Sequence, residues 1–378
     1  MESSEPLPTD AVDAPDLAEL VARPGPFLSI YLNTEPDVEK AGQRSEVRWK
    51  GLRSKLAHRG VPARVLNEID PIVPDAHLSA GCLAVIADAD RVLHVEHGPI
   101  VSPQDISSWR PLPGLLPIIR WRQSEPTFVV VLTDRTGAEL FAVRRGSTGL
   151  HAEVEGEHDV IRKVRPGGWS QRRYQRRAED SWEHNADQVA GALSRFVAQV
   201  RPVFVAVAGD VRAVSLLRAS LPKEVDELVH VIEREVRWNG SGDPIPEEAR
   251  QLADAHVREA EDRLLATFAE ERGQRDDAVA GLERTAGALQ RSQVAALLIA
   301  DGEDDRTLWF GPDPALLAAA EVALKELGVD SPAEAPARDV LVRAALGTGA
   351  RIRVLDRADA VEDGVGALLR WGDRTGSG

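Results

Sequence analysis

The sequence predicts an α/β (α+β) protein of three domains, and three observations support this fold class. The chain has 378 residues, more than a single hydrophobic core usually serves. Short apolar runs rich in β-branched residues alternate with longer amphipathic segments, as in folds that alternate strands and helices. Proline- and glycine-rich stretches at residues 110–121 and 238–249 interrupt this alternation. The expected parts are a mobile acidic tail (1–15), an N-terminal domain (16–122), a middle domain (123–240) and a C-terminal domain (241–378).

The N-terminal domain is predicted to combine strands with one basic helix. Residues 27–33 (FLSIYLN) are rich in aromatic and β-branched side chains and predict the first strand. Residues 81–98 predict a strand pair that turns at its Asp-rich centre. Between them, residues 42–60 predict a helix with Val47, Leu52 and Leu56 facing inward. This helix displays five cations, namely Arg44, Arg48, Arg53, Lys55 and Arg59.

The middle domain is predicted to contain a mixed sheet with helices on its faces. Residues 126–146 predict a hairpin that turns at residues 135–137. A glycine-containing stretch and a long helix follow. Residues 201–210 (RPVFVAVAGD) then predict a strand of the kind buried between helices. With a helix at 211–222 and a strand at 228–236, the order is β-β-α-β-α-β.

The C-terminal domain is predicted to be a second alternating α/β sandwich. Residues 246–289 are helical in pattern and heavily charged. The recurring apolar side of this helical pattern consists of Leu252, Val257, Ala260, Leu264 and Phe268. The remaining expected elements are strands at 294–300 and around 307–311, helices at 314–328 and 338–349, and a strand at 351–356, followed by the apolar residues 364–371 without an assigned structure.

The acidic balance of the chain restricts the partners that it can bind. The net charge is −15, which argues against attraction of DNA or anionic lipid to the whole surface. An anionic partner must therefore bind a local basic patch. No stretch approaches the roughly 18 apolar residues of a membrane span, and the N-terminus is acidic rather than a signal peptide. We expect a cytoplasmic protein that binds neither membrane nor DNA.

One segment, residues 162–177 (RKVRPGGWSQRRYQRR), concentrates positive charge around a glycine pair. Its cations are Arg162, Lys163, Arg165, Arg172, Arg173, Arg176 and Arg177, and it contains no acid. A helix that begins at about Ser170 would place the last four arginines opposite an apolar stripe. Arginine binds phosphate oxygens bidentately and stacks on bases, so this patch suits RNA. A solvated helix face after an ordinary Gly-Gly turn is the alternative.

The same segment carries a family resemblance. Residues 165–190 resemble the middle-domain signature of the archaeo-eukaryotic class-I release factors and Pelota, in which Gly-Gly-Gln-Ser precedes an arginine-bearing helix with His-Asn, here His184 and Asn185. Residues 281–302 resemble the opening of that superfamily's C-terminal domain, and residues 350–370 resemble its closing segment. Because these matches occur in order over all three domains, the chain is identified as a member of the bacterial branch, which contains ribosome hibernation factors.

The resemblance implies a tRNA-shaped protein that occupies the A site of the 70S ribosome and contacts 16S and 23S rRNA. The N-terminal domain would face the decoding centre, where Arg44, Arg48 and Arg53 suit a sequence-independent contact with rRNA. The middle domain would be RNase H-like and would bring a loop of Gly167, Gly168, Trp169, Ser170 and Gln171 to the peptidyl-transferase centre. The C-terminal domain would be L7Ae-like and would contact elongation factor Tu.

Two departures from the family pattern bear on activity. Trp169 occupies the position of the catalytic glutamine of release factors, and an indole is a bulky donor that cannot orient water in the same way. The Asn-Ile-Lys-Ser tetrapeptide that reads stop codons is absent from residues 42–50. We therefore expect a non-catalytic hibernation factor. The alternative is a peptidyl-tRNA hydrolase that rescues stalled ribosomes and uses Gln171, two positions after the glycine pair.

Other chemistry has little support in the sequence. The single cysteine, Cys82, excludes an intrachain disulfide and a cysteine-based zinc site. The histidines form neither a His-x-His nor a His-Glu-x-x-His motif, and no nucleotide fingerprint follows a strand. A two-metal nuclease would need converging carboxylates, for which Asp134 and Asp210 at strand ends are candidates, although acids are common turn residues there. We expect no cofactor and no metal.

Overall fold

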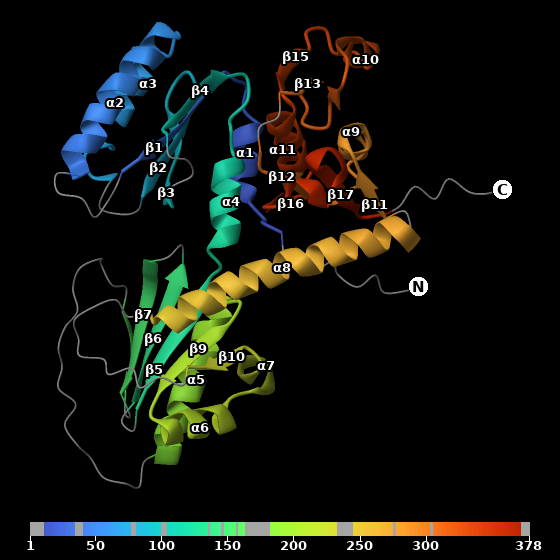
Figure 1. Ribbon diagram of the computed structural model, residues 1–378. Coiled ribbons are helices and arrows are strands. Elements are labelled where there is room, and N and C mark those ends of the chain that lie inside the picture. The colour runs from blue at the N-terminus through green and yellow to red at the C-terminus, as the bar shows by residue number, and fades with distance from the viewer. Residues whose placement is uncertain are drawn as a thin grey trace. The chain divides into compact units, whose positions relative to one another are not determined.

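A computed structural model describes most of the chain as two compact units. The described residues are 11–34, 41–76, 81–99, 104–134, 137–144, 147–155, 158–162, 182–232, 245–274, 277–302 and 305–371. Unit 1 combines residues 1–123 with residues 260–378, and unit 2 comprises residues 124–259 (Figure 1). Within the described residues, no helix is long and apolar enough to span a membrane. Each unit combines sheets with covering helices, which confirms the predicted α/β class, whereas the division into three domains stays a prediction.

The N-terminal part of unit 1 is built on a four-stranded antiparallel sheet. Its strands are β1 (Phe27–Asn33), β2 (Cys82–Ala87), β3 (Val92–Gly98) and β4 (Ile106–Arg110), in the order β3-β2-β1-β4. Alternate side chains of a strand point to opposite faces of its sheet. Leu28 and Ile30 of β1 accordingly belong to one core cluster, while Phe27 and Tyr31 belong to another. The predicted strand at residues 27–33 and the strand pair at 81–98 are confirmed.

The first face of this sheet is covered by α2 (Ala41–His58) and α3 (Ala63–Ile69) (Figure 1). Trp49 and Leu56 of α2 are buried in the cluster that contains Leu28 and Ile30. The predicted helix at 42–60 is confirmed, but the inward placement of Val47 is wrong, because this side chain is 67% exposed. Val47 lies about 200° of helical rotation from Trp49, so both cannot face the sheet.

The second face is covered by α1 (Pro15–Val21) and α4 (Leu116–Ser124), which supply buried apolar side chains to the cluster around Phe27 and Tyr31. The sequence analysis did not predict α1. Residues 11–15 were expected in a mobile tail, but Ala11 and Ala14 are buried and Val12 forms a β-bridge with Ile352. Their small apolar side chains pack despite the acidic and proline-rich context. Residues 1–10 lie outside the described residues.

The C-terminal part of unit 1 contains a mixed four-stranded sheet. Its strands are β11 (Ala278–Ala280), β12 (Val294–Ala300), β16 (Arg351–Leu355) and β17 (Val365–Leu369), in the order β11-β17-β12-β16, with only β12 and β16 parallel. Leu297 and Ile352 pack with α9 (Leu282–Gln290) and α11 (Ala337–Gly347). Leu298 and Leu355 pack with residues 264 and 268 of α8 (Glu247–Gln274). Helices therefore cover both faces, as expected of an α/β sandwich.

Two predictions for the C-terminal region are wrong in detail. The helical pattern at 246–289 is interrupted by β11, so α8 and α9 are separate helices. The helix expected at 314–328 is replaced by β14 (Leu317–Ala318) and α10 (Glu321–Glu326). β14 joins β13 (Thr307–Phe310) and β15 (Ala333–Pro336) in a three-stranded sheet, order β14-β13-β15. Pairing with β13 thus outweighs the helix propensity of this alanine- and leucine-rich stretch.

Unit 2 is built on a six-stranded mixed sheet. Its strands are β5 (Phe128–Thr133), β6 (Gly137–Arg144), β7 (Ser147–Glu155), β8 (His158–Arg162), β9 (Val205–Gly209) and β10 (Val229–Val231), in the order β10-β9-β5-β6-β7-β8. β5 to β8 form an antiparallel meander, and β9 and β10 run parallel to β5. The meander followed by parallel strands across helical crossovers fits the RNase H-like expectation.

Helices cover both faces of this sheet. Leu193 and Phe196 of α5 (Trp182–Val200) and Leu217 of α6 (Val211–Ser220) pack on one face. The other face packs against the first half of α8, with Ala249 and Ala253 buried. The short helix α7 (Lys223–Asp226) precedes β10. β7 and β8 were missed by the sequence analysis, and the predicted strand at 228–236 is described only over β10, since residues 233–244 lie outside the described residues.

One buried carboxyl group in unit 1 is strongly perturbed. Asp339 lies in the first turn of α11, and its side chain is only 13% exposed. Its Oδ2 lies 3.9 Å from Nη1 of Arg110, the last residue of β4. Burial raises the pKa of this carboxyl to about 7, against the attraction of Arg110 and Arg338, which lowers it. The fold therefore favours the neutral form of Asp339.

We predict that Asp339→Asn stabilises unit 1 at and above neutral pH. The folded-state pKa of about 7 exceeds the unfolded value of 3.8, so ionisation costs the folded protein stability progressively between those pH values and by a constant amount above them. The variant should match the wild type near pH 4 and exceed its free energy of unfolding in urea by about 2–4 kcal/mol near pH 8. A difference that does not change with pH would contradict this account.

Candidate functional site

The predicted glycine-arginine segment lies almost entirely outside the described residues. Arg162 is the last residue of β8, and the described chain resumes at Trp182, the first residue of α5. The predicted site residues outside the described part are Lys163, Arg165, Gly167, Gly168, Trp169, Ser170, Gln171, Arg172, Arg173, Arg176 and Arg177. Their proposed roles stay predictions, as does the start of the helix at Ser170.

The helix that follows this segment is firmly attached to the sheet of unit 2. Val189, Leu193 and Phe196 of α5 are all at most 3% exposed and pack against β5, β6 and β9 residues. This confirms the predicted apolar stripe for the described part of the helix. The first turn of α5, with Asn185, lies at the carboxyl end of the parallel strands β5 and β9.

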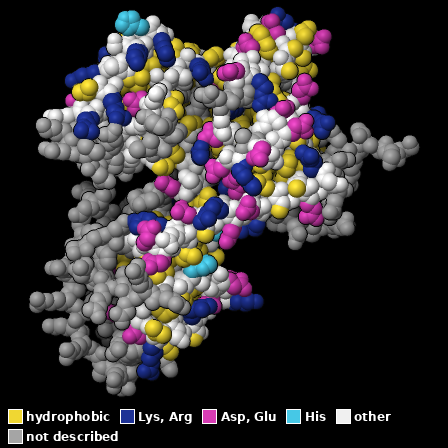
Figure 2. Space-filling view, viewed as in Figure 1, with side chains coloured by type: hydrophobic (Ala, Val, Ile, Leu, Met, Phe, Trp, Pro, Cys, Tyr) yellow, Lys and Arg dark blue, Asp and Glu magenta, His cyan; other side chains and the backbone are white. Residues whose placement is uncertain are grey.

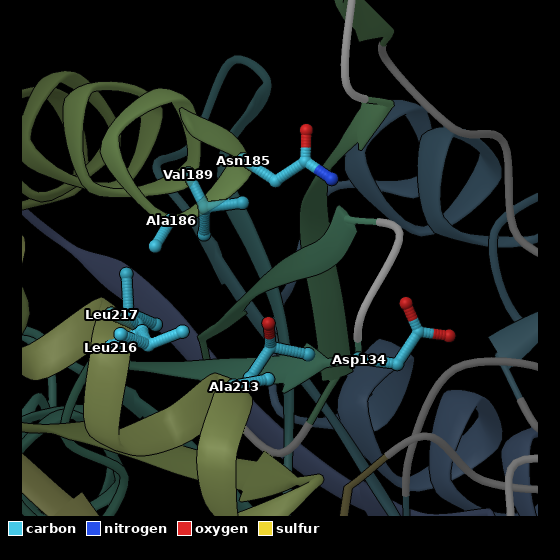
Figure 3. A pocket seen from close by; sticks show the side chains of 8 residues that line it. Asp134, Asn185, Ala186, Val189, Ala213, Leu216 and Leu217 are labelled. Carbon is cyan, nitrogen blue, oxygen red and sulfur yellow. The ribbon is translucent and has the colours of Figure 1, made fainter. Parts of the chain in front are cut away.

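A shallow pocket lies at this edge of the sheet, between α5 and α6 (Figure 3). Its lining residues are Thr133, Asp134, Asn185, Ala186, Val189, Ala213, Leu216 and Leu217. Figure 3 shows Asn185 and Asp134 at one side of the pocket and Leu216 and Leu217 at the other. The carboxyl ends of parallel strands are the usual place for binding in open α/β sheets. Asn185 belongs to the His-Asn pair that contributed to the family resemblance.

Close approach of β5 and β9 shapes the strand end beside this pocket. Gly209, the last residue of β9, has φ of +145°, and a Cβ atom there would lie 1.8 Å from the carbonyl oxygen of Thr133. A side chain at this position is therefore excluded. Glycine allows the backbones of residues 133 and 209 to meet directly, and Asp210 donates its backbone N–H to the carbonyl oxygen of Thr133.

The two acids considered as metal ligands have local structural roles. Asp210 is the N-cap of α6, and its Oδ1 accepts hydrogen bonds from the backbone N–H groups of Arg212 and Ala213 at 3.0 and 3.2 Å. Oδ1 of Asp134 accepts from the backbone N–H of Gly137 at 3.2 Å, in the turn between β5 and β6. In the part of the chain that the structure describes, no group of three or more His, Cys, Asp or Glu side chains is arranged to hold a metal ion.

A second candidate surface is the outer face of α2. The cations that this face exposes are Arg44, Lys50, Lys55 and Arg59, with Arg59 just beyond the end of the helix. Glu46 is the one acid between residues 41 and 59. Figure 2 shows Lys and Arg side chains gathered over α2 and α3. We call these four residues the α2 basic face. Its charge contrasts with the net charge of −15 of the whole chain.

The structure changes which cations of α2 face solvent. Nη1 of Arg48 lies 3.8 Å from Oδ1 of Asp105. Arg53 donates hydrogen bonds to Asp70 at 3.1 Å and to Asn67 at 2.7 Å. The side chains of Arg48 and Arg53 are 33% and 35% exposed and paired with acids, so they are displayed only in part, and their contact with rRNA stays a prediction. Arg44 is exposed as predicted.

Lys50 was not singled out from the sequence, although a signal for it exists. Trp49 anchors the inward side of α2, and it also donates its indole N–H to Asp70 at 2.7 Å. Rotation of 100° per residue from that anchor turns Lys50 away from the sheet. The prediction that Val47 faces inward gives the helix a rotation that the structure does not have.

Comparison with known proteins shows the family to which the chain belongs. The model of Bacterial archaeo-eukaryotic release factor family 2 matches residues 127–274. Two uncharacterized proteins of Mycobacterium tuberculosis, MT2704 and Rv2629, are each 30% identical to the chain over 363 residues, covering 93% of the chain and 95% of the relative. The chain therefore belongs to the bacterial branch of the archaeo-eukaryotic release factor superfamily, to which its sequence had been assigned by resemblance.

Solved structures with similarity to the chain include an archaeal Pelota complex and a yeast translation termination-like factor. A model of ribosome-bound archaeal Pelota and ABCE1 is 12% identical, with a TM-score of 0.40, over 77% of this chain and 78% of the other. Dom34 of S. cerevisiae, described as a translation termination-like factor that interacts with Hbs1, is 11% identical, with a TM-score of 0.40, over 77% and 73%.

We predict that Asp210 stabilises unit 2 as a helix cap. Asp210→Ala should lower the free energy of unfolding by about 1 kcal/mol, whereas Asp210→Asn, which can also cap, should change it little. Urea unfolding followed by circular dichroism measures both variants. Addition of Mg²⁺ should leave the urea midpoints of the wild type and of both variants unchanged. Stabilisation of the wild type alone by Mg²⁺ would assign Asp210 to a metal site instead.

Proposed function

We propose that this protein is a non-catalytic translation factor that occupies the A site of the 70S ribosome and protects idle ribosomes during starvation or stress. The observation that carries the proposal is the exposed α2 basic face on a chain of net charge −15 that belongs to the release factor superfamily. A cation-rich helix face on an acidic protein restricts polyanion binding to that surface and orients the molecule.

The α2 basic face is suited to rRNA at the decoding centre. Lys50 and Lys55 lie about 7.5 Å apart along the helix axis and about 140° apart around it, so they occupy the two flanks of the exposed side of α2, where both can reach phosphate groups. Lysine and arginine contacts of this kind bind the backbone of the nucleic acid irrespective of its sequence. A factor that recognises idle ribosomes needs this type of contact, because no particular codon has to be read.

The glycine-arginine segment is the second contact in this proposal, with 23S rRNA at the peptidyl-transferase centre. Its arginines supply the charge, and Trp169 is suited to stack on a base. The same tryptophan supports a non-catalytic role, since its indole cannot position water through an acceptor group. This segment reaches the ribosome in the proposal while unit 2 holds its two ends at Arg162 and Trp182.

We propose further partners from family membership. The solved Pelota complex is described as ribosome-bound, and Dom34 is described as interacting with Hbs1. By analogy, the C-terminal part of this chain would contact elongation factor Tu, and the protein would act in the cytoplasm without cofactor or metal. This analogy depends on family membership alone.

Peptidyl-tRNA hydrolysis is the alternative function, and one observation favours it. Gly167 and Gly168 are both present, and Gln171 follows them closely. A loop that only fills space does not require two adjacent glycines, whereas close approach to a reacting ester does. In this alternative Gln171 would position the water that attacks the ester.

We predict that charge reversal on either basic surface weakens ribosome binding. Lys50→Glu with Lys55→Glu should reduce affinity about 10- to 100-fold at low salt and make the dependence of log K on log salt concentration shallower by about 2. Arg172→Glu with Arg176→Glu should abolish co-sedimentation. The matched control is Lys223→Glu with Lys325→Glu, which makes the same charge change at exposed sites on α7 and α10. Equal losses in the control would show that total charge, and not the α2 basic face, governs binding.

A release assay distinguishes the two functions. Ribosomes that carry peptidyl-tRNA in the P site are incubated with the purified protein, and free peptide is measured over time. The proposal predicts no release above background for the wild type and for Gln171→Ala. Release by the wild type that disappears in Gln171→Ala would instead establish the hydrolase.

A further inference from the structure

Unit 1 combines an N-terminal and a C-terminal part of the chain. We call residues 11–123 the N-terminal module and residues 260–371 the C-terminal module. One hydrophobic cluster contains Phe27 and Trp121 of the first module together with Leu297, Val340 and Leu341 of the second. The two modules therefore share a core, and the contact between them is made chiefly by α1, α4, α11 and β16 (Figure 1).

The outer edge of β16 is covered entirely by groups of the N-terminal module. β16 pairs with β12 along its other edge. At Ile352, the backbone of Val12 forms two hydrogen bonds: its N–H donates to the Ile352 carbonyl oxygen at 2.8 Å and its carbonyl oxygen accepts from the Ile352 N–H at 3.1 Å. At Val354, the side-chain amide of Gln123 imitates a strand, since Nε2 donates to the carbonyl oxygen at 2.6 Å and Oε1 accepts from the N–H at 2.8 Å.

The helix that follows Val12 is held by apolar and ionic contacts at once. Leu17, Leu20 and Val21 of α1 are buried in the shared core, at 0, 7 and 1% exposure. On its other side, the Asp16 carboxylate accepts two hydrogen bonds from Arg122, at 2.7 and 2.6 Å. Nη2 of Arg122 also donates to the buried carboxylate of Glu96 on β3 at 2.8 Å.

This ion-pair cluster is partly shielded from solvent, since the side chains of Arg122 and Glu96 are 12% and 2% exposed. The hydrogen bonds from Arg122 lower the pKa of Asp16, and the guanidinium binds it bidentately. α4 adds contacts with the C-terminal module, because Arg120 forms ion pairs with Asp301 and with Asp356. Arg122 thus joins α1, β3 and α4 of the N-terminal module to one another, and Val12 and Gln123 join this module to β16.

We propose that residues 11–22 are a strap that holds the N-terminal and C-terminal modules together as one rigid body. The strap alone supplies the bridge to Ile352 and the three apolar side chains between the modules. It begins at the edge of β16, where Val12 bridges Ile352, and continues along α11, and its buried side chains lie in the core that the two modules share. An unprotected strand edge and an exposed apolar face would otherwise favour separation or aggregation.

The strap has a functional consequence for surfaces far apart in the chain. The α2 basic face and the surface of the C-terminal module keep a fixed separation as long as the strap is seated. Recognition of any partner that contacts both surfaces then requires no ordering of the two modules, which lowers the entropic cost of binding. The inference depends only on contacts inside unit 1 and not on the proposed ribosomal function.

Full-length variants test the strap. Leu17→Asp with Leu20→Asp places charges on its buried side, and the matched control, Pro15→Asp with Ala22→Asp, places them at exposed strap positions. Hydrogen exchange at Ile352 should accelerate about 10- to 100-fold in the first variant only, the factor that corresponds to an unmade buried hydrogen bond. Amides of β12 serve as an internal measure that the C-terminal module is folded.

The second readout is the distance between spin labels on Ser54→Cys in α2 and Val322→Cys in α10, both exposed positions. We expect one narrow distribution for the wild type and the control variant, and a broad one for Leu17→Asp with Leu20→Asp. If that variant loses protection in β12, the C-terminal module is itself unfolded, and a second variant is used. Val12→Pro removes the N–H that donates to Ile352, and the same two measurements are made on it. A broad wild-type distribution, or strap variants with unchanged distance and exchange, would overturn the proposal.

Discussion

The packing of α2 on the first sheet of unit 1 determines which of its charges meet solvent, and the proposed RNA contact depends on this packing. Trp49 and Leu56 are buried against β1 and β2 side chains and set the rotation of the helix. Arg48 and Arg53 then reach Asp105 and Asp70, while Lys50 and Lys55 point outward. Two of the cations are thus paired with acids, while the four residues of the α2 basic face are exposed on the remaining sides of the helix.

In unit 2, as on α2, the residues that pack on the sheet are different from the residues that are proposed to bind RNA. α5 is fixed to the sheet by Leu193 and Phe196, and the close contact of Gly209 with Thr133 fixes the strand ends beside its first turn. The glycine-arginine segment is therefore connected to a well-packed α/β body. In the proposed function, unit 2 carries the glycine-arginine segment to the peptidyl-transferase centre. The proposed strap keeps the N-terminal and C-terminal modules of unit 1 at a fixed separation.

Elements with a continuous physical signal could be predicted from the sequence. β1 was identified because its residues include aromatic and β-branched side chains, and the inner stripe of α5 was identified by its helical period. α1 was missed because seven residues in an acidic, proline-containing stretch carry too short a period, and its stability comes from distant partners such as Arg122. β14 was missed because β13 pairing overrides local propensity. The prediction for Val47 was wrong because Val47 and Trp49 are both apolar and cannot both face the sheet. Packing of Trp49 in the core decides between them.

A density map of 70S ribosomes incubated with the purified protein tests the central claim most directly. The account predicts density for the protein in the A site, with α2 against 16S rRNA at the decoding centre and residues 163–181 directed into the peptidyl-transferase centre. An A site without this density at saturating protein, or a bound protein whose α2 basic face points to solvent, would contradict it.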